Sequence, residues 1–489
     1  MKDVCVRIDQ QNNYQVEFPF LGSSRFTEIE SYFGDDFVRE DADNAVYNNF
    51  RKLLIDMGLD NEHVDSPQWN PFAGFIKKGE RVVIKPNLVL HHNKMADDID
   101  AVVTNAVLLR PIIDYALMAL DGTGELIVAD APHGDADFES VVKQNGLRKL
   151  IDWYNSKGYA VDLRDLRKYY YPHGFSNSIM TEREGDVDDY VLVQLKGNES
   201  YLDGVSHLER LYGSDYDRSF IVKQHVNSIH KYLISGTVLK ADVIISVPKL
   251  KTHKKTGVTI NLKNLVGING NKNYLAHYRV GSPRQGGDEY PDTKNLLLRV
   301  HYALERFSKD HLLARNTRWG RVVYGLFLRY PSAALLVLYK RIFHQYPPVM
   351  GNWYGNDTCW RMCLDLNYIL RFSDKNGLVH NTPQRKYFCV VDGIVGGEED
   401  GPMDPTPKVT GLLAIGTNPY YTDYVCVHAM GFDPDKMKLY SESFTKKNLA
   451  DMNYDNMDVS MIVDNCPVFY KEANLHFKAQ AGWRGHIEK

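Results

Sequence analysis

The sequence is poor in cysteine, with six in 489 residues, and no two of them are spaced as Cys-x-x-Cys. Cys359 and Cys363 are four residues apart and would offer two soft ligands at most. Iron–sulfur clusters and structural zinc sites need three or four such ligands. The pattern therefore predicts reduced, separate cysteines, as in cytoplasmic proteins, and no iron–sulfur cluster is expected.

Several motifs and segments are also missing. No stretch of eighteen consecutive apolar residues occurs, so no transmembrane helix is expected, and the first twenty residues lack the apolar core of a signal peptide. The sequence has no G-x-S-x-G, no H-E-x-x-H, no Walker motif and no G-x-G-x-x-G after a strand. These absences disfavour hydrolase triads, zinc peptidases, P-loop nucleotide sites and standard NAD(P) sites.

The chain carries no excess of positive charge. It has 58 Lys and Arg against 62 Asp and Glu, a net charge of −4. We therefore expect no nucleic-acid partner, and any basic site has to be local.

Five runs of consecutive apolar residues each end in proline, glycine or polar residues. Within these runs, apolar and polar residues do not alternate. Continuous runs of this kind are typical of strands buried on both faces of a parallel sheet. Helical patterns at Asn105–Leu120 and Phe138–Gly158 lie between them. The sequence predicts an α/β fold, a mostly parallel sheet flanked by helices. The runs are Arg81–Asn87, Gly124–Pro132, Ala241–Lys249, Tyr387–Gly397 and Gly411–Pro419.

A break in the strand–helix rhythm suggests the domain organisation. We expect an N-terminal extension over residues 1–75 and two parts of the α/β core at 76–270 and 387–489. A loop and a large helical insertion, residues 271–386, separate those parts. In such sheets ligands bind beyond the carboxyl ends of the strands, so the polar ends of the five runs are candidates for one shared site.

The stretch Val243–Ile268 carries the strongest chemical signal. It begins as a strand and then places five lysines and a histidine in sixteen residues, without one acidic side chain. Thr256 or Thr259 could cap a helix that begins there, and a helix N-terminus with lysines around it suits a phosphate or another anion. A solvated basic loop is the alternative. The predicted anion-binding residues in and near this stretch are Lys85, Asn87, Lys249, Lys251, Thr256, Gly257, Thr259, Lys263 and Asn264.

Three residues are candidates for acid–base catalysis. His253 lies among lysines, whose charge favours the neutral imidazole that a general base needs. Asp130 and Asp392, each at the end of an apolar run, compete with it for that role.

The acidic loop Val390–Pro405 offers oxygen ligands. Asp392, Glu398 and Asp400 among its glycines would suit Mg²⁺, the candidate metal. The alternative is that these carboxylates pair with the lysine stretch across the site.

Two segments of the insertion supply further candidates. Arg279, Trp353 and Arg361 combine cations and an aromatic ring, which can hold a sugar or a base. Ordinary packing and a surface ion pair are the alternative. The segment Arg318–Gln345 is apolar and basic at both ends, so it suits either helices packed on the protein or on a second copy of the chain, or peripheral contact with the inner membrane face. We expect Leu326, Leu335 and Leu338 to be buried against protein.

Several motifs together resemble the domain of unknown function 362 family. They are IKPNLV, VADAP, VPKLKTH with TINLKNLVGI, VVDGIVGGEEDGP and GTNPYYTDYVCVHAMGF, in that order between Val82 and Asp433. The segments Gly351–Asn367 and Ala481–Glu488 look like a subgroup found among polysaccharide-biosynthesis proteins. Some family members carry CxxCxxC segments of ferredoxin type, which this sequence lacks.

Two functions follow. The first is an enzyme acting on a phosphorylated or nucleotide-activated sugar, or another anionic metabolite, in surface polysaccharide biosynthesis. The second is a non-catalytic anion-binding scaffold at the membrane surface.

Overall fold

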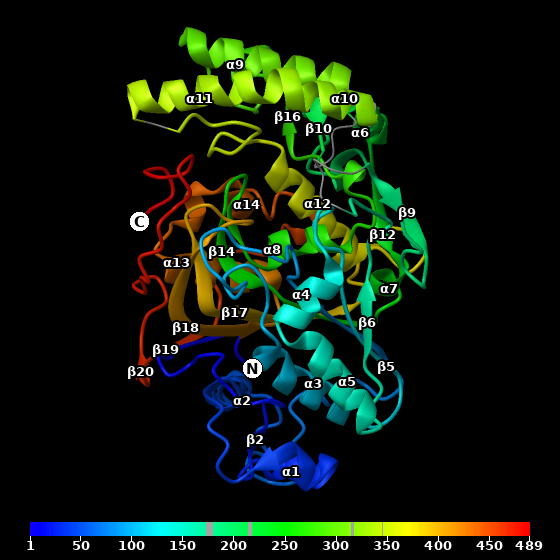
Figure 1. Ribbon diagram of the computed structural model, residues 1–489. Coiled ribbons are helices and arrows are strands. Elements are labelled where there is room, and N and C mark those ends of the chain that lie inside the picture. The colour runs from blue at the N-terminus through cyan, green and yellow to red at the C-terminus, as the bar shows by residue number, and fades with distance from the viewer. Residues whose placement is uncertain (173–178, 214–217, 314–316, 345) are drawn as a thin grey trace.

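The computed structural model describes residues 1–172, 179–213, 218–313, 317–344 and 346–489. Its central sheet, several strands of which are labelled in Figure 1, has the order β20-β19-β1-β18-β17-β13-β4-β5-β6. The run β17-β13-β4-β5-β6 is parallel throughout, which confirms the predicted α/β fold with a mostly parallel sheet. The strands are β1 (Val4–Ile8), β4 (Arg81–Pro86), β5 (Glu125–Asp130), β6 (Asp162–Asp165), β13 (Val243–Val247), β17 (Lys386–Glu398), β18 (Thr406–Gly416), β19 (Val459–Val463) and β20 (Cys466–Pro467).

The fifth apolar run departs from the prediction. It forms β18, which is antiparallel to β17, with Gly416 opposite Cys389 at the start of that strand. The residues that follow Gly416 therefore lie at the opposite edge of the sheet from the ends of the other four runs. The expectation that all five ends share one site is wrong for this run.

Helices cover both faces of the sheet, because alternate residues of each strand face opposite sides. On one face, Val82 and Ile84 join the core formed with α2 (Ala45–Met57), α3 (Ala106–Leu120), α4 (Phe138–Gln144) and α5 (Leu147–Ser156). On the other, Val83 and Ile244 join the core with α12 (Cys359–Phe372), α13 (Pro419–Met430) and α14 (Lys438–Ser441). The predicted helix Asn105–Leu120 is α3, capped by the Asn105 side chain. The second predicted helix is interrupted at Gly146, which has a φ of 83°.

The N-terminal residues are not confined to the periphery. Strand β1 lies inside the central sheet, antiparallel to β18 and parallel to β19. A second, three-stranded sheet is formed by β11 (His225–Val226), β12 (Ile229–Ser235) and β9 (Tyr190–Lys196).

The strand that follows β13 positions the lysines. After Pro248 the chain continues as β14 (Lys249–His253), which pairs with β17 so that Lys249 lies opposite Asp392. Strand β15 (Gly257–Thr259) returns antiparallel to β14 and leads into the short helix α8 (Asn261–Asn264).

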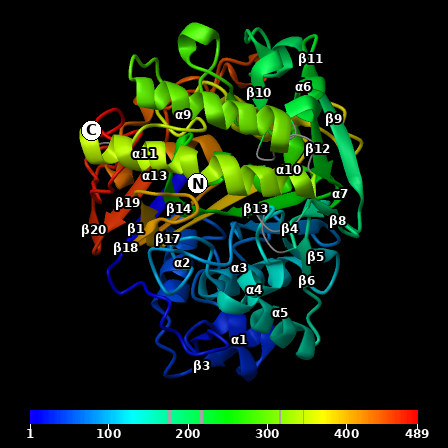
Figure 2. The ribbon, with the colours of Figure 1, turned by 45° about the horizontal axis from the view of Figure 1, so that its top comes forward.

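The insertion contains a helical hairpin at one end of the molecule. Helix α9 (Leu296–Phe307) lies beside α10 (Arg318–Val323) and α11 (Tyr330–Phe343), with a π-helical segment, Tyr324–Arg329, joining the last two (Figure 2). The helix over Arg318–Phe343 is, by length and composition, able to cross a membrane, the one such helix among the described residues. Leu326 is 63% and Leu338 44% exposed, so the expectation that they are buried is wrong. Gln345, at the end of the predicted segment, lies outside the described residues.

Candidate functional site

Two buried ion pairs lie at the carboxyl edge of the parallel strands. Lys85 Nζ lies 2.7 Å from Asp130 Oδ1, and Lys249 Nζ lies 2.9 Å from Asp392 Oδ2. All four side chains are buried. The structure thus brings together the ends of four predicted strands, and carboxylates from other strands neutralise two of the cations.

Asp392 is fully engaged in this packing. Besides Lys249, its carboxylate accepts hydrogen bonds from the Tyr14 hydroxyl and from the backbone N–H of Asn105, the latter at 3.1 Å. It does not line the cavity described below. These contacts, and its position outside the cavity lining, favour a structural role for Asp392 over those of catalytic base and metal ligand.

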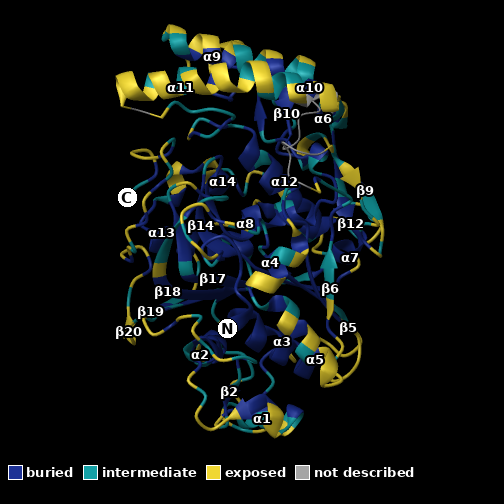
Figure 3. Ribbon diagram, in the orientation of Figure 1, coloured by how far each residue is buried: buried dark blue, intermediate teal, exposed yellow. Residues whose placement is uncertain are grey.

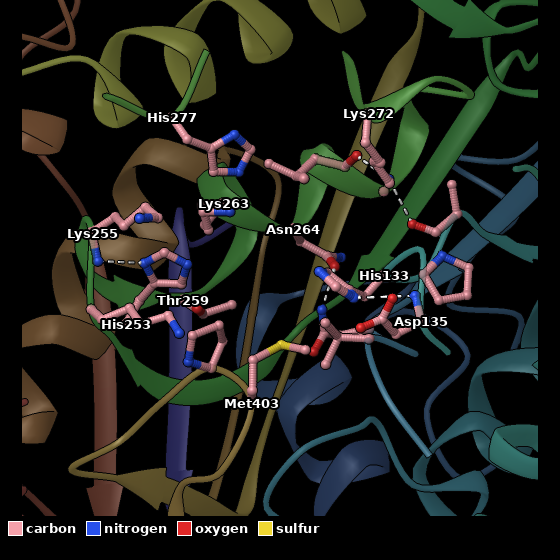
Figure 4. A pocket seen from close by; sticks show the side chains of 18 of the residues that line it. His133, Asp135, His253, Lys255, Thr259, Lys263, Asn264, Lys272, His277 and Met403 are labelled. Atoms are coloured by element: carbon pink, nitrogen blue, oxygen red, sulfur yellow. Dashed lines mark hydrogen bonds between the residues drawn. The ribbon is translucent and has the colours of Figure 1, made fainter. Parts of the chain in front are cut away.

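A cavity of about 360 Å³ (Figure 4) is lined in part by Asp130 of the first ion pair. Of the predicted site residues, seven line it: Asn87, Asp130, Lys251, His253, Thr259, Lys263 and Asn264. Its lining includes five lysines, namely Lys251, Lys254, Lys255, Lys263 and Lys272, and two carboxylates, Asp130 and Asp135. Because Asp130 is already paired with Lys85, positive charge predominates in this cavity.

The lysines differ in their contacts. Lys251 Nζ donates to Asn87 Oδ1 at 2.9 Å and to the Val102 carbonyl at 2.5 Å. Burial, and then the charges of Lys249 and Lys263, hold the Lys251 pKa well below its usual range. The Lys263 side chain makes no hydrogen bond or ion pair within the described part of the chain, although the residue is only 8% exposed.

Lys272 and Thr259, which also line the cavity, differ in whether their side chains have hydrogen-bond partners. Lys272 Nζ donates to the carbonyls of Ala131 at 2.8 Å and Val266 at 3.0 Å, and burial lowers its pKa to about 7. The Thr259 hydroxyl oxygen is buried without a hydrogen-bond partner among the described residues. Within the described residues, Lys263 and Thr259 therefore have unused hydrogen-bonding capacity towards a ligand.

Three histidines line the cavity, His133, His253 and His277, and the last two have opposite tautomers. His253 Nδ1 accepts hydrogen bonds from the backbone N–H groups of Lys255 at 3.0 Å and Thr256 at 3.2 Å, so its proton lies on Nε2. His277 Nδ1 lies 2.8 Å from the Leu275 carbonyl and must donate to it, so its Nε2 carries a lone pair. Burial, followed by the charge of Lys263, holds both pKa values well below the usual range.

These tautomers change the assignment of the base. The predicted general base His253 presents a donor, because its only lone pair is used by two backbone amides. His277, which the sequence did not single out, presents the lone pair that a base requires.

The N-terminus of α8, the helix that follows the predicted anion-binding loop, is not open to a ligand. The backbone N–H groups of Asn261 and Leu262 donate to the two carboxylate oxygens of Asp423, each at 2.9 Å. Burial raises the pKa of Asp423 to about 7. Thr256 and Gly257 do not line the cavity: the Thr256 hydroxyl donates to the Val258 carbonyl, and Gly257, with φ 81°, packs against Met437 and Trp483. A protein carboxylate therefore uses the N–H groups that a helix N-terminus would offer to an anion.

The sugar-binding candidates of the insertion do not reach the cavity. Arg279 donates to the Ser206 carbonyl at 2.9 Å, and Arg361 is paired with Asp357 at 3.1 Å. Trp353 is buried and donates to the Asp288 carbonyl. The alternative prediction, packing and local ion pairs, describes these three residues.

The predicted metal ligands do not converge. The Glu398 carboxylate accepts from the backbone N–H of Lys478 at 3.0 Å and lies 3.4 Å from Lys408 Nζ, whereas Asp400 is exposed. With Asp392 engaged by Lys249, no three of these carboxylates share a centre. No group of three His, Cys, Asp or Glu side chains able to hold a metal occurs in the described ranges. The donor set does not fit a resident Mg²⁺.

Residues that sequence reasoning missed come from distant segments. His277 and Lys272 lie in the loop that opens the insertion, Met403 in the acidic loop and Asp423 in α13. The one available signal was their position inside or beside the recognised motifs.

Comparison with known proteins identifies the family. The family model described as "Domain of unknown function (DUF362)" matches residues 163–428, more than half of the chain, and the chain belongs to that family. No curated protein matches. A solved structure of a protein from Thermotoga maritima is similar at 11% identity with a TM-score of 0.29, over 75% of this chain and 53% of that one. This chain therefore spans about half the length of that protein, and no argument rests on the similarity.

Proposed function

We propose that this member of the DUF362 family binds a small, multiply anionic metabolite in the lysine-lined cavity and acts on it as an enzyme. The observation that carries the proposal is the convergence of five lysines on one cavity whose Asp130 carboxylate is already neutralised. Buried like charges repel one another, and an anion between them relieves that cost. The volume of about 360 Å³ falls in the range of small-molecule sites.

The free groups of the cavity suit a phosphate. Lys263 supplies an ammonium without an internal partner, and Thr259 supplies a hydroxyl without one in the described chain. Asn264 is held in place by its own contacts, since its Oδ1 accepts from Lys85 Nζ at 3.1 Å. A phosphoryl group bound here would gain charge-assisted hydrogen bonds in a largely desolvated setting.

The histidine pair favours catalysis over simple binding. The bare His277 Nε2 can take a proton from a hydroxyl of the bound metabolite, while the His253 Nε2–H donates to a ligand oxygen.

We further propose a phosphorylated or nucleotide-activated sugar of surface polysaccharide biosynthesis as the substrate class. Both segments that resemble the polysaccharide-associated subgroup contact the lysine loop. Trp483 Nε1 donates to the Lys254 carbonyl at 2.9 Å, and Asn352 Oδ1 accepts from Lys255 Nζ at 3.0 Å. These two segments thus support the same loop that supplies the cations.

A second candidate is a non-catalytic anion-binding scaffold at the membrane surface. The exposed apolar hairpin favours it. A scaffold would need Lys263 to bind the anion but would not need His277 as a base. A variant of His277 therefore distinguishes the two functions. Under the enzyme proposal, His277→Asn abolishes conversion of a nucleotide sugar, followed by phosphorus NMR, while binding is retained.

The test of anion binding is calorimetric titration of sulfate, phosphate and a nucleotide sugar into three proteins. They are the wild type, Lys263→Ala and the exposed control Lys375→Ala. Charge-assisted bonds contribute roughly 1.5–3 kcal/mol, so the Lys263 variant should bind about tenfold or more weakly. The control should match the wild type. Absence of binding by the wild type, or equal affinities in all three, would refute the proposal.

A further inference from the structure

The outer face of the α10–α11 helix exposes many large apolar side chains. Over Arg318–Phe343, only 6% of the most apolar window is buried within the protein (Figure 3). The exposed fractions are 80% for Trp319, 63% for Leu326, 67% for Phe327, 71% for Tyr330 and 65% for Val337. An apolar surface of this density marks an interaction site rather than an ordinary solvated helix.

The inner face of the same helix packs against other residues of the insertion. Leu336 and Tyr339 pack against a small core formed by Tyr290, Leu298 and Tyr302. Tyr330, Ala334 and Val337 recur at spacings of four and three, which places them on one stripe, opposite Leu336 and Tyr339. The hairpin thus holds itself together with one face and leaves the other exposed among the described residues.

The positive charge of the segment 318–343 indicates which kind of partner its exposed face would bind. The segment 318–343 contains five Lys and Arg and no Asp or Glu. Arg318, Arg329, Lys340 and Arg341 are exposed. A helix with large apolar side chains, flanking cations and aromatic residues matches the interface of a bilayer with anionic headgroups. A second copy of the chain would bring two such cationic segments together.

Polar contacts along the hairpin argue that it lies on a membrane. Ser332, in the first turn of α11, donates from its hydroxyl to Glu305 Oε1 of α9 at 2.6 Å, and Ser332 also contacts His301. A spanning position would carry Glu305, together with Arg329, into the hydrocarbon. A surface position leaves these groups at the level of the headgroups.

We propose that the α9–α11 hairpin docks the protein peripherally on a bilayer containing anionic lipid, with the stripe Tyr330–Val337, Leu326 and Phe327 entering the interface. The cavity is not part of this surface. Membrane docking and anion binding are therefore independent properties that separate variants can test.

The experiment is vesicle flotation of the full-length protein. Vesicles of phosphatidylcholine alone are compared with vesicles of equal parts phosphatidylcholine and phosphatidylglycerol, at low and high salt. The outer-face variant is Phe327→Glu/Val337→Glu. The control is Val187→Glu/Leu378→Glu, whose wild-type side chains are 78% and 63% exposed away from the hairpin. Both variants change the charge equally.

Wild type and control should float with the anionic vesicles, less so at high salt, and the outer-face variant should bind about tenfold or more weakly. Thermal melting should be equal in all three proteins, which excludes misfolding as the cause. A wild type that stays unbound, or an outer-face variant that binds as well as the control, overturns the proposal. So does a wild-type dimer that fails to float and becomes monomeric in the outer-face variant, because a second copy then covers this face.

Discussion

The carboxylate of Asp423 holds the start of α8 by accepting the backbone N–H and the side-chain amide of Asn261, both at 2.9 Å. Its second oxygen accepts the N–H of Leu262. The helix N-terminus, a natural site for an anion, is thus filled by a residue of α13. This contact fixes the turn that carries Lys263 and Asn264 into the cavity.

Replacing Asp423 by alanine should destabilise the protein by roughly 2–4 kcal/mol, because three buried donors lose their acceptor. Anion affinity should fall as well, since α8 would no longer hold Lys263 in position. Urea unfolding and calorimetry of the same samples measure both effects. The exposed Asp455→Ala variant serves as control and should change stability by no more than about 0.5 kcal/mol. Equal stability of the two variants would contradict this role of Asp423.

Lys249 and Lys263 should respond to mutation in opposite ways. Lys249→Met leaves Asp392 as a buried carboxylate without its cation, which typically costs about 3–5 kcal/mol. Lys263→Met deprives no carboxylate of an ion-pair partner within the described chain and relieves repulsion, so stability should be unchanged or higher. Urea midpoints at equal slope give the comparison. Indistinguishable midpoints would mean that the Lys249–Asp392 pair is not a structural element.

The sequence predicted the edge of the sheet but not the partners found there. Continuous apolar runs identify buried parallel strands, and parallel strands place their ends together, so Lys85, Asp130, Lys249 and Asp392 could be expected at one edge. Whether a lysine meets a ligand or a carboxylate depends on which strand is adjacent. The order of strands in the sheet determines which strand is adjacent. That order cannot be predicted from the spacing of residues along a single strand.

Long-range contacts explain the other differences between the site predicted from the sequence and the site in the structure. Asp423 lies 162 residues from Asn261, so no local pattern announces it as a cap. His277 lies in a loop whose path depends on the fold around it, and its tautomer follows from one backbone carbonyl. Trp353 is of a residue type that is common in sugar-binding sites. The residue type does not reveal that its indole N–H donates to a backbone carbonyl within the insertion, that of Asp288.

His253 and His277 should remain neutral as the pH falls from about 8 through 6.5, the usual histidine pKa, because burial and neighbouring lysines depress both pKa values. Nitrogen-15 NMR of histidine-labelled protein should show the proton on Nε2 of His253 and on Nδ1 of His277. The single variants His253→Asn and His277→Asn assign the two signals. Titration of either ring within this range, or the same tautomer in both, would remove the proposed division into donor and base.

Sulfate affinity should fall as the pH rises above neutrality. Sulfate keeps its charge over this range, so the protein alone supplies the dependence. It binds best when the cavity lysines are protonated, whereas burial depresses the pKa of Lys251 and lowers that of Lys272 to about 7. Above the depressed pKa, binding must take up a proton, and the dissociation constant should rise by up to about tenfold per pH unit for each proton linked.

Calorimetry from about pH 6 to pH 9, in buffers that differ in ionisation enthalpy, measures both the affinity and the proton uptake. Lys251→Met should bind sulfate more weakly at low pH and show a shallower dependence, because one linked proton is gone. Lys375→Ala, an exposed lysine outside the cavity, should keep the wild-type slope. If wild-type affinity were constant across this range, the buried lysines would not be the groups that hold the anion, since their protonation would have no bearing on its binding.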